Sequence, residues 1–129
     1  MKEIRPLVTG CSGLLGSTVA EFLEVHHPET ISSTREFLDL NDFWRLRAEF
    51  ERMHPTVVIN CAAYSDVDGC EKNPDRAWRE NRDNVVHLAR ACRAIGAQLV
   101  HISTDYVFDG RQEDPYREGD SCNPISIYG

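Results

Sequence analysis

Three evenly spaced glycines near the start of the chain form a GxxGxxG pattern. Gly10, Gly13 and Gly16 follow the apolar run Pro6–Thr9 and open an amphipathic segment. In such a strand-to-helix turn the first glycine permits a tight turn, the second lets the backbone approach a pyrophosphate, and the third lets helix and strand pack closely. The helix N-terminus adds free N–H groups and a partial positive charge. The pattern predicts a dinucleotide site; the alternative is a packing turn without a ligand.

The segment after the next expected strand bears on which dinucleotide would bind. An acidic residue about 20 residues beyond the glycine turn normally holds the ribose 2′-hydroxyl of NAD. The chain instead has hydroxyl residues followed by Arg35 in the run 31–35, without an acid. This favours a 2′-phosphate, so we expect NADPH, with NADH as the alternative. Arg35 is equally consistent with a solvated loop charge.

Small residues follow the clearest apolar strand. The run Asn60-Cys61-Ala62-Ala63-Tyr64 would lie at the carboxyl end of that strand and leave room for a ribose and a nicotinamide. We interpret Cys61 as a small core residue rather than a nucleophile, because no base lies near it in the sequence.

Composition limits the class of protein. With 129 residues, 41% of them hydrophobic and 27% charged, the chain fits one soluble domain. The net charge of −7 and the scattered basic residues argue against nucleic-acid binding. The 5 cysteines show no CxxC spacing and the 5 histidines no ligand spacing, so we expect free thiols in a cytoplasmic protein and no metal. No uncharged stretch is long enough to span a membrane.

Apolar runs alternate with amphipathic segments along the chain. Strands are predicted at 6–9, 29–33, 56–60 and 98–102, with a further very short strand at 37–40. Helices are predicted from Leu14 to before Pro28, after a cap at Asn41 or Asp42, and from Pro74 to a C-cap at Gly96. The connection from 61 to 73 is expected to be a loop, and 109–123 to be turn-rich.

This alternation predicts an α/β fold. We expect residues 1–108 to form a Rossmann-like parallel sheet of about four or five strands with helices on both faces. No linker or repeat interrupts the pattern, so residues 1–129 are predicted to be one NAD(P)-binding domain or one part of such a domain.

A third motif leads to a family resemblance. The run His101–Gly110, HISTDYVFDG, together with the glycine turn and the Tyr128-Gly129 end, resembles the extended short-chain dehydrogenase/reductases, most closely the dTDP-4-dehydrorhamnose reductases. The resemblance implies hydride transfer from a nicotinamide to the keto group of a dTDP-keto-sugar. It implies that Tyr128 is the general acid and that Thr104 binds the reacting carbonyl. Asp105 and Tyr106 would shape the sugar pocket.

The resemblance also implies further cofactor contacts. Asp39 and Leu40 match the family position that lies against the adenine, and Asn81 matches an asparagine that supports the nucleotide loop. The full predicted set of cofactor-binding residues is Gly10, Ser12, Gly13, Leu14, Leu15, Gly16, Arg35, Asp39, Leu40, Cys61, Ala62, Ala63, Tyr64, Ser103 and Tyr128.

In this family a lysine after the tyrosine stabilises the phenolate and holds the nicotinamide ribose. That position falls beyond Gly129, so we expect an N-terminal part of a reductase, truncated before the substrate-binding half and inactive alone. Two alternatives are an NADP-binding regulatory subunit like that of methionine adenosyltransferase, and a nucleotide-sugar epimerase or dehydratase that retains NAD. A homodimer is compatible with each of them.

Overall fold

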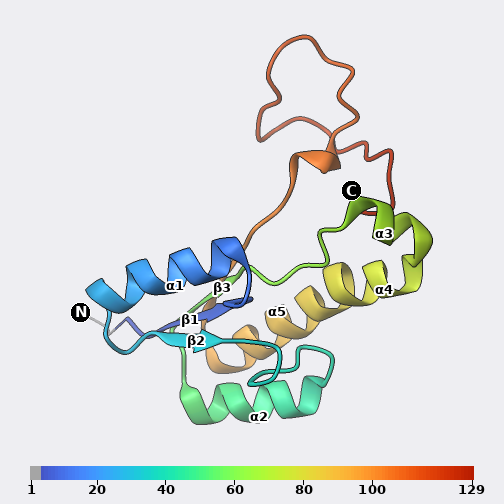
Figure 1. Cartoon of the computed structure of the whole chain (residues 1–129). Coiled ribbons are helices and arrows are strands. Elements are labelled where there is room, and N and C mark those ends of the chain that lie inside the picture. The colour runs from blue at the N-terminus through green and yellow to red at the C-terminus, as the bar shows by residue number, and fades with distance from the viewer. Residues whose placement is uncertain (1–3) are drawn as a thin grey trace.

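Four parallel strands form the centre of the computed structural model, which describes residues 4–129 (Figure 1). The strands are β1 (Pro6–Thr9), β2 (Ile31–Ser33), β3 (Val57–Asn60) and β4 (Gln98–His101). Their order in the sheet is β2-β1-β3-β4, and every neighbouring pair is parallel. Pro6 is the first residue of β1, the position that its missing N–H group allows in a central strand.

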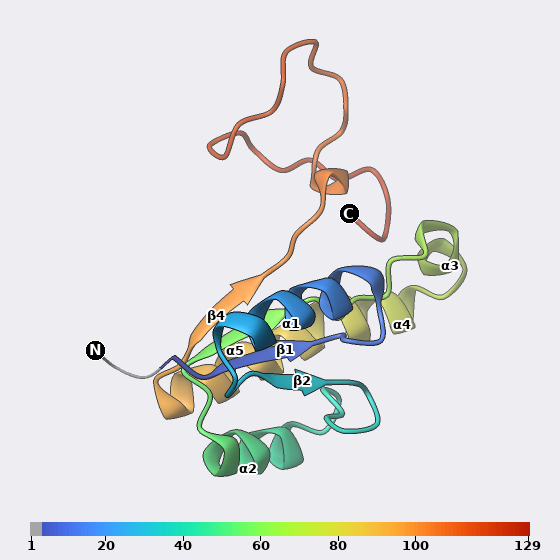
Figure 2. The same ribbon diagram turned by 60° about the vertical axis from the view of Figure 1, so that its left-hand side comes forward.

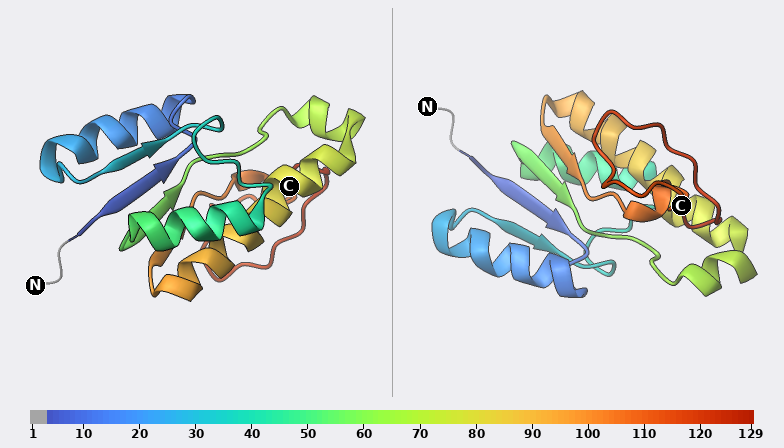
Figure 3. Two further views of the ribbon diagram at one scale, coloured as in Figure 1. Left: turned by 90° about the horizontal axis from the view of Figure 1, so that it is seen from below. Right: turned by 90° about the horizontal axis from the view of Figure 1, so that it is seen from above.

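Helices cover both faces of the sheet, as the alternating pattern predicts. Helix α1 (Leu14–His26) lies on one face, and α2 (Phe43–Met53) and α5 (Asn84–Ile95) lie on the other (Figures 2 and 3). The chain passes from β1 outward to β2 and then returns across β1 to β3. The carboxyl ends of β1 and β3 therefore form the topological switch point, where α/β sheets bind ligands.

The two faces are packed differently. On the side of α2 and α5, Leu7, Leu46, Phe50, Val58 and Leu88 are completely buried, and each such side chain contributes roughly 1.5–3 kcal/mol. On the other side α1 buries only the small residues Gly16 and Ala20, while its larger apolar side chains are exposed (Leu14, Leu15, Phe22 and Val25). Small side chains let α1 lie close to β1 and to the turn before it.

The predicted short strand at 37–40 is wrong. Leu38 and Leu40 are buried in the core, but the backbone between them does not pair with the sheet. The Leu38 N–H bonds to the Thr34 carbonyl at 3.0 Å, and Asp39 Oδ1 accepts the Asn41 N–H at 3.0 Å. These local turns bind the backbone N–H groups of Leu38 and Asn41, which a strand would need for pairing with the sheet.

The predicted loop at 61–73 contains a helix, and the predicted helix from Pro74 to Gly96 contains a π-helical turn. Helix α3 (Val67–Lys72) is capped by Asp66, whose Oδ1 accepts the Gly69 N–H at 2.9 Å. Helix α4 (Pro74–Trp78) then passes through a π-helical turn (Arg79–Asp83) into α5. The predicted caps are confirmed: Asp42 caps α2, and Gly96 ends α5 with φ of +71°.

After β4 the chain leaves the sheet. Residues 102–129 contain only a short 3-10 helix, Asp105–Val107, and form a long excursion that returns beside α3 (Figure 1). There the Ile127 N–H donates to Glu71 Oε1 at 2.7 Å. Across residues 4–129 the helices are all too short or too polar to cross a bilayer.

Candidate functional site

The glycine turn sits at the switch point and is closely packed. Gly10 has φ of +74°, and a Cβ there would lie 2.7 Å from the Ala62 nitrogen. The Gly13 N–H donates to the Gly10 carbonyl at 2.9 Å, which closes the turn. Gly16 faces the Gly10 carbonyl without room for a side chain. Only glycine fits the first and third positions.

Helix α1 begins with free donors. Its N-cap, Gly13, has no side chain to cap the helix, so the first-turn N–H groups of Leu14, Leu15 and Gly16 have no intrahelical partner. Leu14, the first residue of the helix, is 89% exposed. Free N–H groups and the helix dipole together make an anion site.

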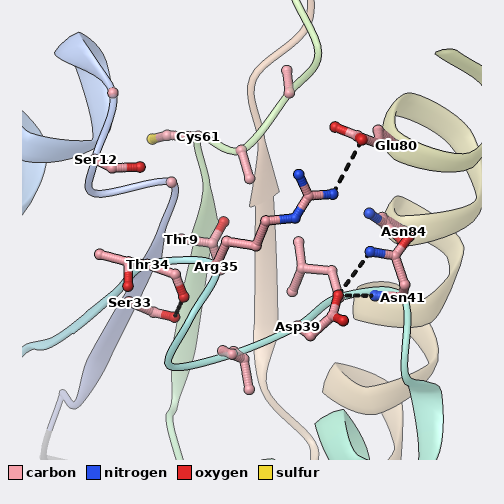
Figure 4. Close-up of a pocket in the computed structure, with 16 residues that line it drawn as sticks. Thr9, Ser12, Ser33, Thr34, Arg35, Asp39, Asn41, Cys61, Glu80 and Asn84 are labelled. Atoms are coloured by element: carbon pink, nitrogen blue, oxygen red, sulfur yellow. Dashed lines mark hydrogen bonds and ion pairs between the residues drawn. The ribbon is translucent and has the colours of Figure 1, made fainter. Parts of the chain in front are cut away.

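A pocket extends from this turn across the end of β2 to α5 (Figure 4). It brings together nine of the predicted cofactor residues: Gly10, Ser12, Gly13, Arg35, Asp39, Leu40, Cys61, Ala62 and Ala63. The remaining lining residues are Thr9, Ser33, Thr34, Leu38, Asn41, Glu80 and Asn84. The predicted residues Leu14, Leu15, Gly16, Tyr64, Ser103 and Tyr128 are not among the residues that line it.

Arg35 crosses this pocket. Its guanidinium pairs with Glu80 Oε1 at 3.1 Å, and Arg76 Nε binds the same oxygen at 3.0 Å (Figure 4). Burial alone would raise the pKa of Glu80, but the bonds from Arg76 and Arg35 lower it below its usual value. Arg35 is therefore held over the pocket by a charged carboxylate, with 61% of its side chain exposed to an incoming anion.

The loop at 38–41 is held in place from two sides. Asp39 Oδ1 accepts from the backbone N–H of Asn41 at 3.0 Å and from its Nδ2 at 2.7 Å. The bond from the Asn41 N–H is the main reason that the pKa of Asp39 is lowered. On α5, the His87 Nδ1–H donates to the Leu40 carbonyl at 2.9 Å. The apolar side chains of Leu38 and Leu40 are thereby fixed against the pocket.

A hydrogen-bonded row joins the carboxyl ends of three strands. The Thr9 hydroxyl donates to Asn60 Oδ1 at 2.5 Å, and the Ala62 N–H donates to the same oxygen at 3.2 Å. Asn60 Nδ2 donates to His101 Nδ1 at 3.0 Å, which requires a neutral imidazole at that nitrogen. Partial burial lowers the pKa of His101 and favours that form. These hydrogen bonds fix the backbone of Cys61 and Ala62 at the end of β3.

Cys61 lines the pocket as a thiol. Burial, with a smaller contribution from Cys11, raises its pKa above the ordinary value. Tyr64 does not line the pocket. Its backbone N–H donates to Asn81 Oδ1 at 2.8 Å, and its carbonyl accepts from Asn81 Nδ2 at 2.9 Å. The Arg76 guanidinium lies 3.9 Å from the centroid of the Tyr64 ring. Asn81, in the π-helical turn, thus supports the segment after β3.

The predicted catalytic residues lie on the C-terminal segment. The Thr104 hydroxyl accepts the Tyr106 N–H at 3.2 Å and donates to Asp105 Oδ1 at 3.3 Å. The ring of Tyr128 packs edge-on against Tyr106, with centroids 5.5 Å apart. Asp105 and Tyr106 border a second cavity, shared with Phe108 and other residues of the same segment (Asp109, Gly110, Tyr116, Ile125 and Ser126).

Among the pocket residues that sequence reasoning missed are Asn41, Glu80 and Asn84. Glu80 is 45 positions from its partner Arg35, so no local pattern connects them. Asn84 carried a usable signal, since it occupies the buried stripe of α5 with Leu88 and Ala91. A polar residue in such a stripe needs a partner.

Comparison with known proteins fits this geometry. The RmlD substrate binding domain family matches residues 4–129. The chain belongs to this family. A dTDP-4-dehydrorhamnose reductase of Streptomyces griseus is 42% identical over 125 residues, which cover 97% of this chain and 41% of that protein.

Solved structures agree. A dTDP-4-dehydrorhamnose reductase of Clostridium acetobutylicum is 40% identical with a TM-score of 0.93, over 96% of this chain and 44% of that one. The Bacillus anthracis enzyme, solved in complex with NADP, is 34% identical with a TM-score of 0.94, over 99% of this chain and 46% of that one. The chain therefore spans less than half the length of these relatives and has their fold.

Proposed function

We propose that this chain is the nucleotide-binding part of an NADPH-dependent reductase that converts dTDP-4-dehydro-6-deoxy-L-mannose to dTDP-L-rhamnose. The observation that carries the proposal is the pocket at the switch point, which joins the glycine turn, the free α1 N-terminus and Arg35. Membership of the family and similarity to an NADP-bound dTDP-4-dehydrorhamnose reductase support it.

The pocket residues fit the parts of NADPH in order. The pyrophosphate would lie over Gly10, Gly13 and the N–H groups of Leu14 and Leu15. The 2′-phosphate would meet Arg35, whose planar guanidinium suits phosphate. The remaining contacts follow the same order, with the adenine against Asp39 and Leu40 and the nicotinamide near Cys61, Ala62 and Ala63.

The chemistry divides between the pocket and the C-terminal segment. When bound, the nicotinamide supplies a hydride to the keto carbon. Thr104 would hold the keto oxygen with its hydroxyl, and Tyr128 would hand its phenol proton to that oxygen. Asp105 and Tyr106, on the border of the second cavity, would contact the sugar. Alignment of these groups supplies much of the rate.

Two measurements test this function. Fluorescence titration should show that the chain binds NADPH more tightly than NADH. The reductase assay uses the full-length parent protein and follows the loss of NADPH absorbance on addition of the dTDP-4-keto-sugar, with NMR of the product to establish the configuration at C4. Tight NADPH binding by a parent that turns over no keto-sugar would favour the regulatory alternative, and a retained NAD without net oxidation would favour an epimerase or dehydratase.

A further inference from the structure

Two carboxamides in the pocket have oxygens without a partner. Asn84 is only 6% exposed and lines the pocket, and its Oδ1 accepts no hydrogen bond. Asn41 Oδ1 is likewise buried and unpartnered, although its Nδ2 is bound to Asp39. Both residues lie on the α5 side of the pocket (Figure 4). A buried acceptor without a donor is costly, so its presence needs a reason.

Neither asparagine is explained by the fold. Asn84 stands in the buried stripe of α5, where Leu88 and Ala91 follow it, and an apolar residue would fill the position without an unmet hydrogen bond. Asn41 is fixed by Asp39, which takes its amide donor and leaves the oxygen as the free end. The pair therefore presents acceptors to whatever enters this end of the pocket.

The surroundings define the ligand group. Leu38 and Leu40, 3% and 8% exposed, offer an apolar surface in the same part of the pocket. An apolar surface beside hydrogen-bond acceptors suits a planar heterocycle that carries an amino donor. In a dinucleotide whose phosphates lie at the glycine turn, the adenine has this chemistry, with two N–H donors on its 6-amino group.

We propose that Asn84 recognises the adenine base, accepting a hydrogen bond from its 6-amino group at Oδ1. This rests on the proposed binding of NADPH. The 6-amino group thereby supplies the donor that the buried Asn84 oxygen lacks within the protein.

The proposed hydrogen bond between Asn84 and the 6-amino group can be tested with a thermodynamic cycle that combines one substitution with one change of ligand. The probes are NADPH and an analogue whose base is unsubstituted purine, which lacks the 6-amino group. The wild-type chain should bind the analogue about tenfold more weakly than NADPH, the size expected for one lost hydrogen bond. Asn84→Leu should bind NADPH about tenfold more weakly than wild type and should bind the two ligands nearly equally.

Controls separate this contact from general damage. Asn123→Ala, in the C-terminal segment away from the pocket, should leave both affinities unchanged. Asn84→Ala serves if Asn84→Leu does not fold, and circular dichroism verifies each variant. If Asn84→Leu or Asn84→Ala still discriminates the two ligands as wild type does, the inference is wrong. If wild type binds neither NADPH nor NADH, the proposed function itself fails.

Discussion

In the part of the chain up to His101 the candidate site is made largely of backbone held by a buried core, whereas residues 102–129 offer side chains on an exposed excursion. Gly10, Gly13 and the start of α1 are fixed by β1, β3 and the row from Thr9 to His101. Thr104 and Tyr128 are held mainly by contacts within their own segment and by Glu71 of α3. The comparison indicates that the proposed nucleotide site is preformed, while the side chains proposed to react depend on how their segment is placed.

The largest expected effect lies in the second region. In the full-length parent protein, Tyr128→Phe should lower kcat about 10²- to 10⁴-fold, because it removes the proposed proton donor. The affinity for NADPH should change little, since the pocket residues are untouched. Steady-state kinetics and a direct NADPH titration of the same variant measure the two quantities. An undiminished kcat would show that Tyr128 is not the acid.

The second prediction concerns the preformed region. Gly10→Ala combines a φ of +74° with a Cβ that would lie 2.7 Å from the Ala62 nitrogen. It should lower the free energy of unfolding by about 3 kcal/mol and weaken NADPH binding by at least about tenfold. Denaturant unfolding and titration measure these changes.

Gly96→Ala is the matched control for this glycine. Gly96 also has a positive φ, +71°, but no atom within 4 Å of the added Cβ. It should cost about 1 kcal/mol and leave NADPH affinity intact. If Gly10→Ala and Gly96→Ala weakened NADPH binding equally, the effect at Gly10 would come from the strained positive φ of the alanine and not from its close contact with Ala62.

The third prediction separates the two dinucleotides. Arg35→Ala should reduce the ratio of NADPH to NADH affinity about tenfold, because a charged hydrogen bond to the 2′-phosphate is lost. Arg82→Ala removes an arginine that pairs with Asp83 outside the pocket and should leave the ratio unchanged. If Arg35→Ala also leaves it unchanged, Arg35 is only a surface charge.

These outcomes bear on how far sequence reasoning reaches. The strands and the glycine turn were predictable because each is a local pattern, an apolar run or a fixed spacing. The segment at 37–40 was mistaken for a strand because its leucines are apolar, whereas the deciding bond runs from Asn41 to the Asp39 side chain. Helix α3 was missed because its stability comes from the Asp66 cap rather than from an apolar stripe.

The candidate site shows the same division. Gly10 and Gly13 could be found because a turn that brings its backbone close to a ligand requires glycines at a fixed spacing. Glu80 could not be connected with the pocket, since its position depends on the π-helical turn. Asn84 signals only that a buried polar residue needs a partner, and its place at the pocket depends on how α5 packs on the sheet. The pairing of Tyr128 with Tyr106 depends on the path of the whole excursion.

The smallest expected effect is a dependence of stability on pH. Because the pKa of His101 is lowered from the ordinary 6.5, folding favours the neutral ring. The contribution of neutral His101 to the stability of the fold is therefore complete above pH 6.5 and is lost as the pH falls below that value. Denaturant unfolding should show a small loss of stability as the pH falls from about 7 to 5. His101→Asn keeps an acceptor for Asn60 and should reduce this slope; an unchanged slope would assign it to other groups.

The ion pair between Arg35 and Glu80 has a consequence for selectivity. Because Glu80 pairs with Arg35 Nη2, it offsets part of the positive charge that a 2′-phosphate would meet. If the phosphate displaces this carboxylate, Glu80 retains Arg76 as a partner. Salt screens the internal ion pair as well as the phosphate contact. The affinity for NADPH should therefore fall less steeply with ionic strength than it would if Arg35 had no internal partner.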